Sequence, residues 1–246
     1  GCMSHFAGKT YWLVCASEGL GEALAHQLSA LGANLILSAR NKDRLEIVAQ
    51  ALPGEAKVVT MDIADDASVA KAAEAAGDID GMVFLAGIYW PMPATDWKLD
   101  QGVAMADVNF TGAFRVLGHT LPRMVAKDAG HIVITGSLSG FRGLPGAIGY
   151  GASKAGVMSL AESLRSDLWR TGVDVQLANP GFIKTRLTDK NEFNMPFLMT
   201  SEEAATHMVR LMKTPGKFQL NFPMVFSWVF RLSRRLPDWL YYRMFA

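Results

Sequence analysis

Tyr150 and Lys154 stand four residues apart, and Ser137 lies upstream of them in the same stretch of chain. On a helix, this spacing places a phenol and an ammonium group on one face. A neighbouring cation favours the phenolate and lowers the pKa of a tyrosine from its usual value of about 10. We therefore expect Tyr150 to exchange a proton near neutral pH. The alternative is an exposed helix that carries an aromatic residue and a lysine one turn apart.

Short apolar runs alternate with amphipathic helical patterns, which favours a parallel sheet covered by helices on both faces. The expected strands are 11–14, 34–38, 56–61, 81–85, 131–135, 173–178 and 218–222. The expected helices are 19–31, 43–52, 67–76, 105–126, 150–170 and one that opens at a capping box at 200–203. We predict an α/β fold in a single domain spanning 1–246, a Rossmann-type doubly wound parallel sheet of about seven strands.

The composition excludes several classes of protein. The chain has 246 residues, 24 of them basic and 23 acidic, and this scattered balance gives no nucleic-acid footprint. No segment is long and uncharged enough to span a bilayer, and the first residues lack an apolar secretory core. Cys2 and Cys15 are too few for a disulfide framework, so a cytoplasmic setting is expected. The five histidines lack metal-ligand spacing, so we predict no catalytic metal.

The turn after the first expected strand is rich in small residues. Such a turn lets the backbone approach a pyrophosphate, and the helix that follows offers amide donors and a favourable dipole. The residues expected to hold the phosphates are Ser17, Gly19, Leu20 and Gly21. A tight turn without a ligand is the alternative.

Arg40 closes the second expected strand, and no acidic residue stands beside it. In a dinucleotide fold, an acid at this point accepts a hydrogen bond from a free ribose hydroxyl, whereas an arginine accommodates a 2′-phosphate. We therefore favour NADP(H) over NAD(H), although Arg40 could also be an ordinary exposed arginine. Asp62 could accept from the adenine amino group with Ile63 packed against the ring, or it could only form the turn before the next helix.

In this order, the motifs resemble those of the short-chain dehydrogenase/reductase family, over nearly the whole chain. The motifs are the glycine-rich turn, Asp62-Ile63, Ala86-Gly87, Asn109, Ser137, Tyr150 with Lys154, and the segment from Pro180 to Thr185. The resemblance implies an enzyme that transfers hydride between a nicotinamide and a carbonyl or secondary alcohol.

The resemblance also implies a role for each matching residue. Tyr150 would be the general acid for reduction, Lys154 would lower its pKa and hold the nicotinamide ribose, and Ser137 would bond the substrate oxygen. Asn109 would hold a water that links Lys154 to solvent. Around the cofactor, Ala86 and Gly87 match the family motif, Pro180 and Gly181 would wall the nicotinamide, and Ile183 and Thr185 would bind its carboxamide. Donors aimed at the oxygen where charge develops would supply the catalysis.

Two positions depart from the family pattern. Cys15 stands where the family has the first glycine of the turn, with Val14 in place of the usual threonine. Phe84 stands where the family has an asparagine that braces the sheet. A buried, inert thiol is the favoured interpretation of Cys15 over a reactive one. These departures motivate the alternative that the chain is a catalytically silent relative that binds a nucleotide or a partner protein.

The later part of the chain suggests how the substrate is enclosed. Residues 184–213 are expected to form a substrate lid, and the aromatic and methionine side chains in and just before it suggest a hydrophobic substrate: Phe182, Phe193, Met195, Phe197 and Met199. The small residues of the helix that carries Tyr150 predict a homodimer or homotetramer.

The variable tail, 223–246, mixes aromatic residues and arginines at helical spacing. A cap over the substrate pocket or a subunit contact is the favoured interpretation of this tail, and a helix lying on a membrane surface is the alternative.

Overall fold

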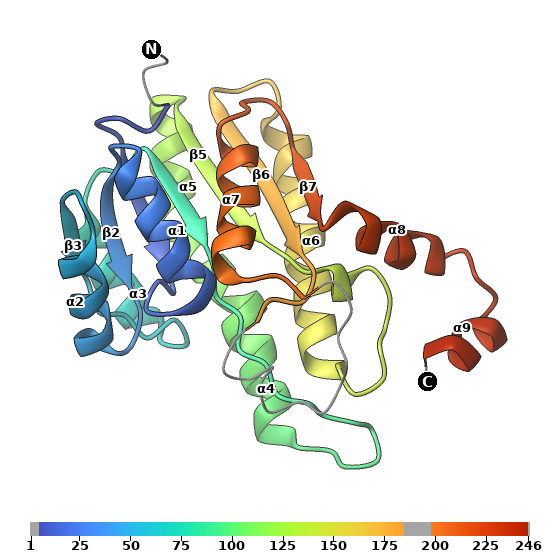
Figure 1. The fold of residues 1–246 in the computed structure, drawn as a ribbon. Helices are drawn as coiled ribbons and strands as arrows, with labels where there is room; N and C mark the ends of the chain where they lie inside the picture. Colours follow the sequence, from blue (N-terminus) through green and yellow to red (C-terminus); the bar gives the residue numbers. More distant parts are fainter. Residues whose placement is uncertain (1–4, 185–197, 246) are drawn as a thin grey trace.

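A computed structural model describes residues 5–184 and 198–245 of the chain. At its centre lies one seven-stranded sheet in the order β3-β2-β1-β4-β5-β6-β7, in which all neighbouring strands are parallel (Figure 1). The strands are β1 (Thr10–Val14), β2 (Asn34–Ser38), β3 (Ala56–Val58), β4 (Gly81–Phe84), β5 (Gly130–Thr135), β6 (Val173–Pro180) and β7 (Gln219–Phe222). The predicted doubly wound fold of about seven strands is confirmed.

Helices cover both faces of the sheet and form two hydrophobic clusters with it (Figure 1). One face is covered by α1 (Gly19–Ala30), α2 (Lys42–Ala51) and α7 (Ser201–Met212). The opposite face is covered by α3 (Asp66–Ala76), α5 (Gly112–Lys127) and α6 (Ile148–Leu168). Because both faces of the sheet are buried, its inner strands are continuous apolar runs rather than alternating ones.

The parallel register brings the ends of the strands to one edge of the sheet. Val14 pairs with Ser38 on one side and with Phe84 on the other, and Phe84 pairs with Ile134. At the far side, Thr135 pairs with Ala178. The loops that follow these strands therefore leave from the same edge, where the sequence places its polar and glycine-rich motifs.

The long helix predicted over 105–126 is interrupted in the structure. The segment consists of α4 (Leu99–Ala106), a π-helical turn (Asp107–Thr111) and α5. Isolated π-helical turns within helices are frequent at functional sites. The third strand is also shorter than predicted and ends at Val58. Beyond it, the amide of Val59 donates to the carbonyl of Leu37 in β2, and the amide of Met61 donates to the carbonyl of Ala39 just after β2.

The predicted lid is described in part. Residues 185–197 lie outside the described residues, whereas Ser201–Met212 forms α7, whose buried side chains pack against the core next to α1. The tail forms two helices, α8 (Met224–Ser233) and α9 (Asp238–Phe245), which project from the β7 side of the sheet (Figure 1). Within the described ranges, no helix has the length and apolarity to cross a membrane.

Candidate active site

Most of the predicted site residues lie at or just after the carboxyl ends of the strands, whereas Asn109 lies in the π-helical turn and Tyr150 and Lys154 lie on α6. Thr185 lies outside the described residues. The order of the strands reverses between β1 and β4, with β2 on one side and β5 on the other. In open parallel sheets, ligands bind in the crevice at this switch point. The sequence motifs therefore surround the place where the fold is suited to hold a dinucleotide.

The turn between β1 and α1 keeps a shape that suits glycine. Gly19 has φ +59°, and a Cβ on Gly21 would lie 2.4 Å from the carbonyl oxygen of Cys15. The amides of Cys15 and Ala16 both donate to the carbonyl of Ser38, at 2.7 and 3.2 Å, and hold the turn against β2. The glycines at positions 19 and 21 thus let the start of α1 approach this turn closely.

Cys15 adopts a left-handed backbone conformation with φ +72°, although it is not a glycine. Such a conformation costs a residue with a Cβ about 1–2 kcal/mol. At this departure from the family pattern, the backbone thus has a conformation that glycine adopts without strain. Burial raises the pKa of the thiol to about 11, so it is protonated at neutral pH. A protonated thiol is a weak nucleophile, which agrees with the interpretation of Cys15 as inert.

Phe84, the other departure, is fully buried in the core cluster between the sheet and α3, α5 and α6. Cys15 is partly buried and packs against the same cluster. The two unusual residues thus belong to one apolar layer, in which Phe84 fills space where the family has a polar brace.

Lys154 is the central buried charge of the site, with 2% of its surface exposed. Its Nζ donates to the carbonyl of Ala86 at 3.1 Å and to the carbonyl of Thr135 at 3.2 Å, which ties α6 to the ends of β4 and β5. The same Nζ lies 5.7 Å from the centre of the Tyr150 ring. The spacing of Tyr150 and Lys154 on α6 therefore does bring the phenol and the amine together.

The pKa of Tyr150 moves in the direction opposite to the prediction. Burial raises the pKa of Tyr150 above its ordinary value, and the hydrogen bond to Ser137 lowers it only in part. Burial also lowers the pKa of Lys154 to about 8. A lysine desolvated in this way is a weaker neighbouring charge, and its nearest acceptors are two backbone carbonyls rather than the phenol. Tyr150 is consequently held in its protonated form.

Ser137 follows β5 and begins a short 3-10 turn, Leu138–Gly140. Its hydroxyl lies 2.8 Å from the hydroxyl of Ser139 and accepts from the Ser139 amide at 3.2 Å. Its hydrogen bond with Tyr150 makes the two hydroxyls neighbours. Two hydroxyls side by side can both donate to a single substrate oxygen.

Asn109 is completely buried in the π-helical turn. Its side chain accepts from the amide of Ile88 at 2.8 Å, and donates to the carbonyl of Ile88 at 2.9 Å and to the hydroxyl of Ser153 at 3.1 Å. Because Ser153 in turn donates to the carbonyl of Tyr150, Asn109 links the segment after β4 to the start of the helix that carries the tyrosine. Its predicted role in holding a water stays a prediction.

The residues predicted to contact the adenosine lie on the β2 and β3 side. Arg40 is exposed and lies two residues after the end of β2. Asp62 forms the turn before α3, because its carboxylate accepts from the amide of Ala64 at 3.0 Å. Ile63 is buried in the core, where a Cβ on Gly112 would lie 2.8 Å from it.

The residues predicted around the nicotinamide lie on the β4 and β6 side. Gly87 leaves open the space beside Lys154, since a Cβ there would lie 3.0 Å from its Nζ. Gly181 donates its amide to the carbonyl of Phe222 at 2.7 Å, and Ile183 forms an isolated bridge with Met199.

Three site residues were not predicted from the sequence. Tyr89 packs edge-to-face on the ring of Tyr150 with 5.3 Å between the ring centres, Ser139 bonds Ser137, and Ser153 bonds Asn109. Ser139 and Ser153 stand one or two positions from a predicted residue, so their closeness to it in the chain was the available signal. Tyr89 likewise stands two positions after the predicted Gly87, but its contact with Tyr150 depends on the path of the chain after β4.

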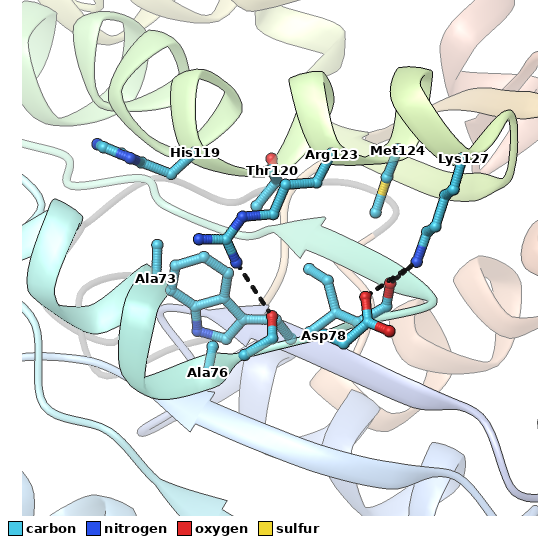
Figure 2. Close-up of a pocket in the computed structure, with 11 residues that line it drawn as sticks. Ala73, Ala76, Asp78, His119, Thr120, Arg123, Met124 and Lys127 are labelled. Atoms are coloured by element: carbon cyan, nitrogen blue, oxygen red, sulfur yellow. Dashed lines mark hydrogen bonds and ion pairs between the residues drawn. The ribbon is translucent and has the colours of Figure 1, made fainter.

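A small cavity lies on another part of the molecule, between α3 and α5 (Figure 2). There Arg123 donates to the carbonyl of Gly77 at 3.3 Å, and Lys127 pairs with Asp78 at 3.2 Å. Its volume of about 10 Å³ is close to the minimum for one water molecule. These contacts fasten α5 to the turn after α3 and give no room for a substrate.

The family model described as short chain dehydrogenase matches residues 9–195. The chain belongs to this family. This short-chain dehydrogenase is 35% identical to an uncharacterized oxidoreductase of Myxococcus xanthus, over 97% of each chain. A solved short-chain dehydrogenase/reductase family protein is 28% identical, with a TM-score of 0.81 and coverage of 88% of this chain and 96% of that one.

Another similar structure is an alcohol dehydrogenase from Thermococcus sibiricus complexed with 5-hydroxy-NADP. It is 25% identical with a TM-score of 0.78, and the match covers 87% of this chain and 95% of that one. The short-chain dehydrogenase described here is thus an oxidoreductase that acts on CH–OH or C=O groups with a nicotinamide cofactor.

Proposed function

We propose that this short-chain dehydrogenase is an NADP(H)-dependent oxidoreductase that interconverts a carbonyl and a secondary alcohol of a hydrophobic substrate. The observation that carries the proposal is the convergence of Ser137, Tyr150 and Lys154 beside the switch point of the sheet. Asn109 stabilises the start of α6 through its hydrogen bond to Ser153, which bonds the carbonyl of Tyr150.

The residues of the turn fit a bound dinucleotide. A Cβ at Gly21 would overlap the backbone of Cys15, so the helix N-terminus approaches the turn as closely as a pyrophosphate site requires. Arg40 supports the phosphorylated cofactor because it lies after the end of β2, where a dinucleotide fold places the adenosine ribose. Its charge also lowers the pKa of the Cys15 thiol, so it lies near this turn. The similar alcohol dehydrogenase complexed with 5-hydroxy-NADP is consistent with this choice.

In the proposed chemistry, a bound nicotinamide supplies or accepts hydride, and the protein manages the proton. Tyr150, kept protonated by burial, donates its proton to the carbonyl oxygen during reduction. Ser137 donates a second hydrogen bond to the same oxygen where negative charge develops. Lys154, with a pKa of about 8, can return a proton toward Tyr150 after each turnover.

The apolar surroundings of Ser137 support a hydrophobic substrate. Leu138 is buried with Phe226 and Phe230 of α8, and the partly buried side chains of Phe141 and Phe182 pack against them. An apolar wall beside the reacting hydroxyls favours a substrate with little charge near its carbonyl.

We further propose a homodimer or homotetramer formed through α6. Ala152 and Ala155 are exposed on this helix, and small exposed residues permit close helix packing. Gly156 serves a contact within the chain instead, since a Cβ there would lie 2.8 Å from the ring of Phe110. The cytoplasmic location stays a prediction.

The decisive experiment replaces Tyr150 with phenylalanine. We expect Tyr150→Phe to bind NADPH like the wild type, measured by fluorescence titration, and to lose about 100-fold or more in kcat on a panel of apolar ketones and aldehydes. The control is Tyr242→Phe on the exposed face of α9, which should keep its turnover. Full turnover by Tyr150→Phe would refute the assignment, and wild-type protein that binds NADPH without reducing any carbonyl would favour the catalytically silent alternative.

The cofactor choice is tested at Arg40. Loss of a charge-assisted hydrogen bond to the 2′-phosphate should weaken NADPH binding by about tenfold or more in Arg40→Ala while NADH binding stays the same. Arg44→Ala, at the start of α2, is the matched control. An unchanged preference between the two cofactors in Arg40→Ala would mean that another group reads the phosphate.

A further inference from the structure

The helix α8 is apolar on two opposite faces. Its inner face, with Phe226 and Phe230, is buried against Leu138 and the partly buried Phe182. Its outer face is exposed to solvent along its whole length: Met224 65%, Val225 65%, Trp228 55%, Val229 41% and Leu232 54%. A helix that is apolar all round is normally buried on all sides. The apolar residues of the inner face are thus explained by their packing as a cap beside Ser137. The exposed apolar residues of the outer face need another explanation.

Arginines border this outer face, and within residues 5–184 and 198–245 none of them forms an ion pair with an acidic residue. Arg231, Arg234 and Arg235 are exposed, and the chain from 224 to 237 contains no aspartate or glutamate. The first acidic residue after this stretch, Asp238, pairs with Arg142 at 3.1 Å. The surface therefore combines apolar side chains with a positive charge that the tail does not neutralise.

The helix α9 also exposes apolar and aromatic side chains beside an arginine. It exposes Trp239 by 66%, Tyr242 by 57% and Met244 by 60%, and its Arg243 is also exposed. Tryptophan and tyrosine have an apolar body and a polar tip, which suits them to the boundary between lipid headgroups and acyl chains.

A groove beside α8 adds donors suited to phosphate. It is lined by the three arginines together with Trp228 and the side-chain amides of Gln219 and Asn221 on β7. Guanidinium groups bind phosphate oxygens through paired, charge-assisted hydrogen bonds. Glu162 is the acidic residue in this lining, against three arginines.

Arg142 fastens both helices to the body of the enzyme. Its guanidinium donates to the carbonyl of Ser233 at 2.6 Å and of Leu236 at 3.3 Å, and lies 4.0 Å from the centre of the Tyr241 ring. The hydroxyl of Tyr241 donates to the carbonyl of Gly143. The exposed surface is therefore a fixed one, attached to the segment between Ser137 and α6 (Figure 1).

We propose that α8 and α9 dock on an anionic lipid surface, with the outer face of α8 in the headgroup region and the arginines on lipid phosphates. The exposed apolar residues supply contact area, and each arginine adds attraction to anionic lipid. A second copy of the chain is a poorer occupant, because a symmetric contact would bring the same three arginines toward each other, with Glu162 as the one acidic residue among the described residues that line the groove.

The test is co-sedimentation of the full chain with vesicles. We expect binding to phosphatidylcholine vesicles that contain phosphatidylglycerol, little binding to pure phosphatidylcholine, and release by salt. Arg234→Gln with Arg235→Gln should weaken binding by about 30-fold, since each arginine near the surface contributes about fivefold. Arg210→Gln, at an exposed arginine of α7, is the control.

The apolar part is tested with matched tryptophans. Trp228→Ala should reduce vesicle binding about tenfold or more, whereas Trp97→Ala, at a tryptophan of nearly equal exposure (57%) before α4, should not. Equal binding to both kinds of vesicle, or equal loss in the two tryptophan variants, would overturn the proposal. The proposal would also fail if the wild type showed no vesicle binding but formed a dimer in sedimentation velocity that Trp228→Ala dissociated. That result would assign the face to a second copy of the chain. Carbonyl reduction without vesicles tests the proposed catalytic function separately.

Discussion

Lys154 should make the stability of the protein depend on pH in a direction that can be worked out from its burial. Its pKa falls from an ordinary value of 10.5 to about 8 in the folded protein, because burial penalises the charged amine. Between these two values the unfolded chain binds more protons than the folded one. The free energy of unfolding must therefore rise with pH across this window, and the penalty is largest below about pH 8.

The size of the effect follows from the linkage relation. For a group with these two pKa values, the penalty on folding is about 3 kcal/mol at about pH 7 and about 1 kcal/mol at about pH 9.5. The wild type should therefore gain about 2 kcal/mol relative to Lys154→Met over that range. The variant also loses the hydrogen bonds to the carbonyls of Ala86 and Thr135. A neutral amine still donates these bonds, so their loss changes the free energy of unfolding by an amount that varies little with pH.

Urea unfolding of the wild type and of Lys154→Met at several pH values measures this difference directly. Subtracting the two curves cancels the titration of groups that do not interact with Lys154; the Cys15 thiol, whose pKa the Lys154 charge lowers, is not among them. Lys71→Met, at an exposed lysine of α3, is the control and should leave the pH dependence of the wild type unchanged. A difference between wild type and Lys154→Met that is flat from about pH 7 to about pH 9.5 would show that the buried amine is not desolvated, and the reasoning would fail.

Two further predictions concern the turn and the support of the site. Cys15→Gly should be more stable than Cys15→Ala by about 1–2 kcal/mol in chemical unfolding, because only glycine adopts the left-handed backbone without strain; equal stability of the two variants would mean that the turn relaxes. Asn109→Ala should lower the free energy of unfolding by about 2 kcal/mol or more, because the partly buried amide and carbonyl of Ile88 lose their partner. Asn34→Ala, at an exposed asparagine, should change it little, and a similar loss in both variants would contradict that account.

The sequence by itself determined the fold and the family. The strands are buried on both faces, so their apolar runs are continuous and could be located without tertiary information. The i,i+4 spacing of Tyr150 and Lys154 is a local property of a helix, and the parallel order of the strands brings Ser137 to the same edge. The helical spacing of the tail likewise predicted a helix over residues that form α8.

Tertiary structure decided the properties that depend on several segments at once. The interruption of the predicted helix 105–126 accompanies bonds from Asn109 to the chain after β4, which no local pattern reveals. The direction of the pKa shift of Tyr150 depends on desolvation by every neighbour, and this outweighs the effect expected from one lysine on the same helix. The two apolar faces of α8 could be told apart only once Leu138 and Phe182 were seen to cover one of them, because burial is a property of the packed molecule rather than of the residue.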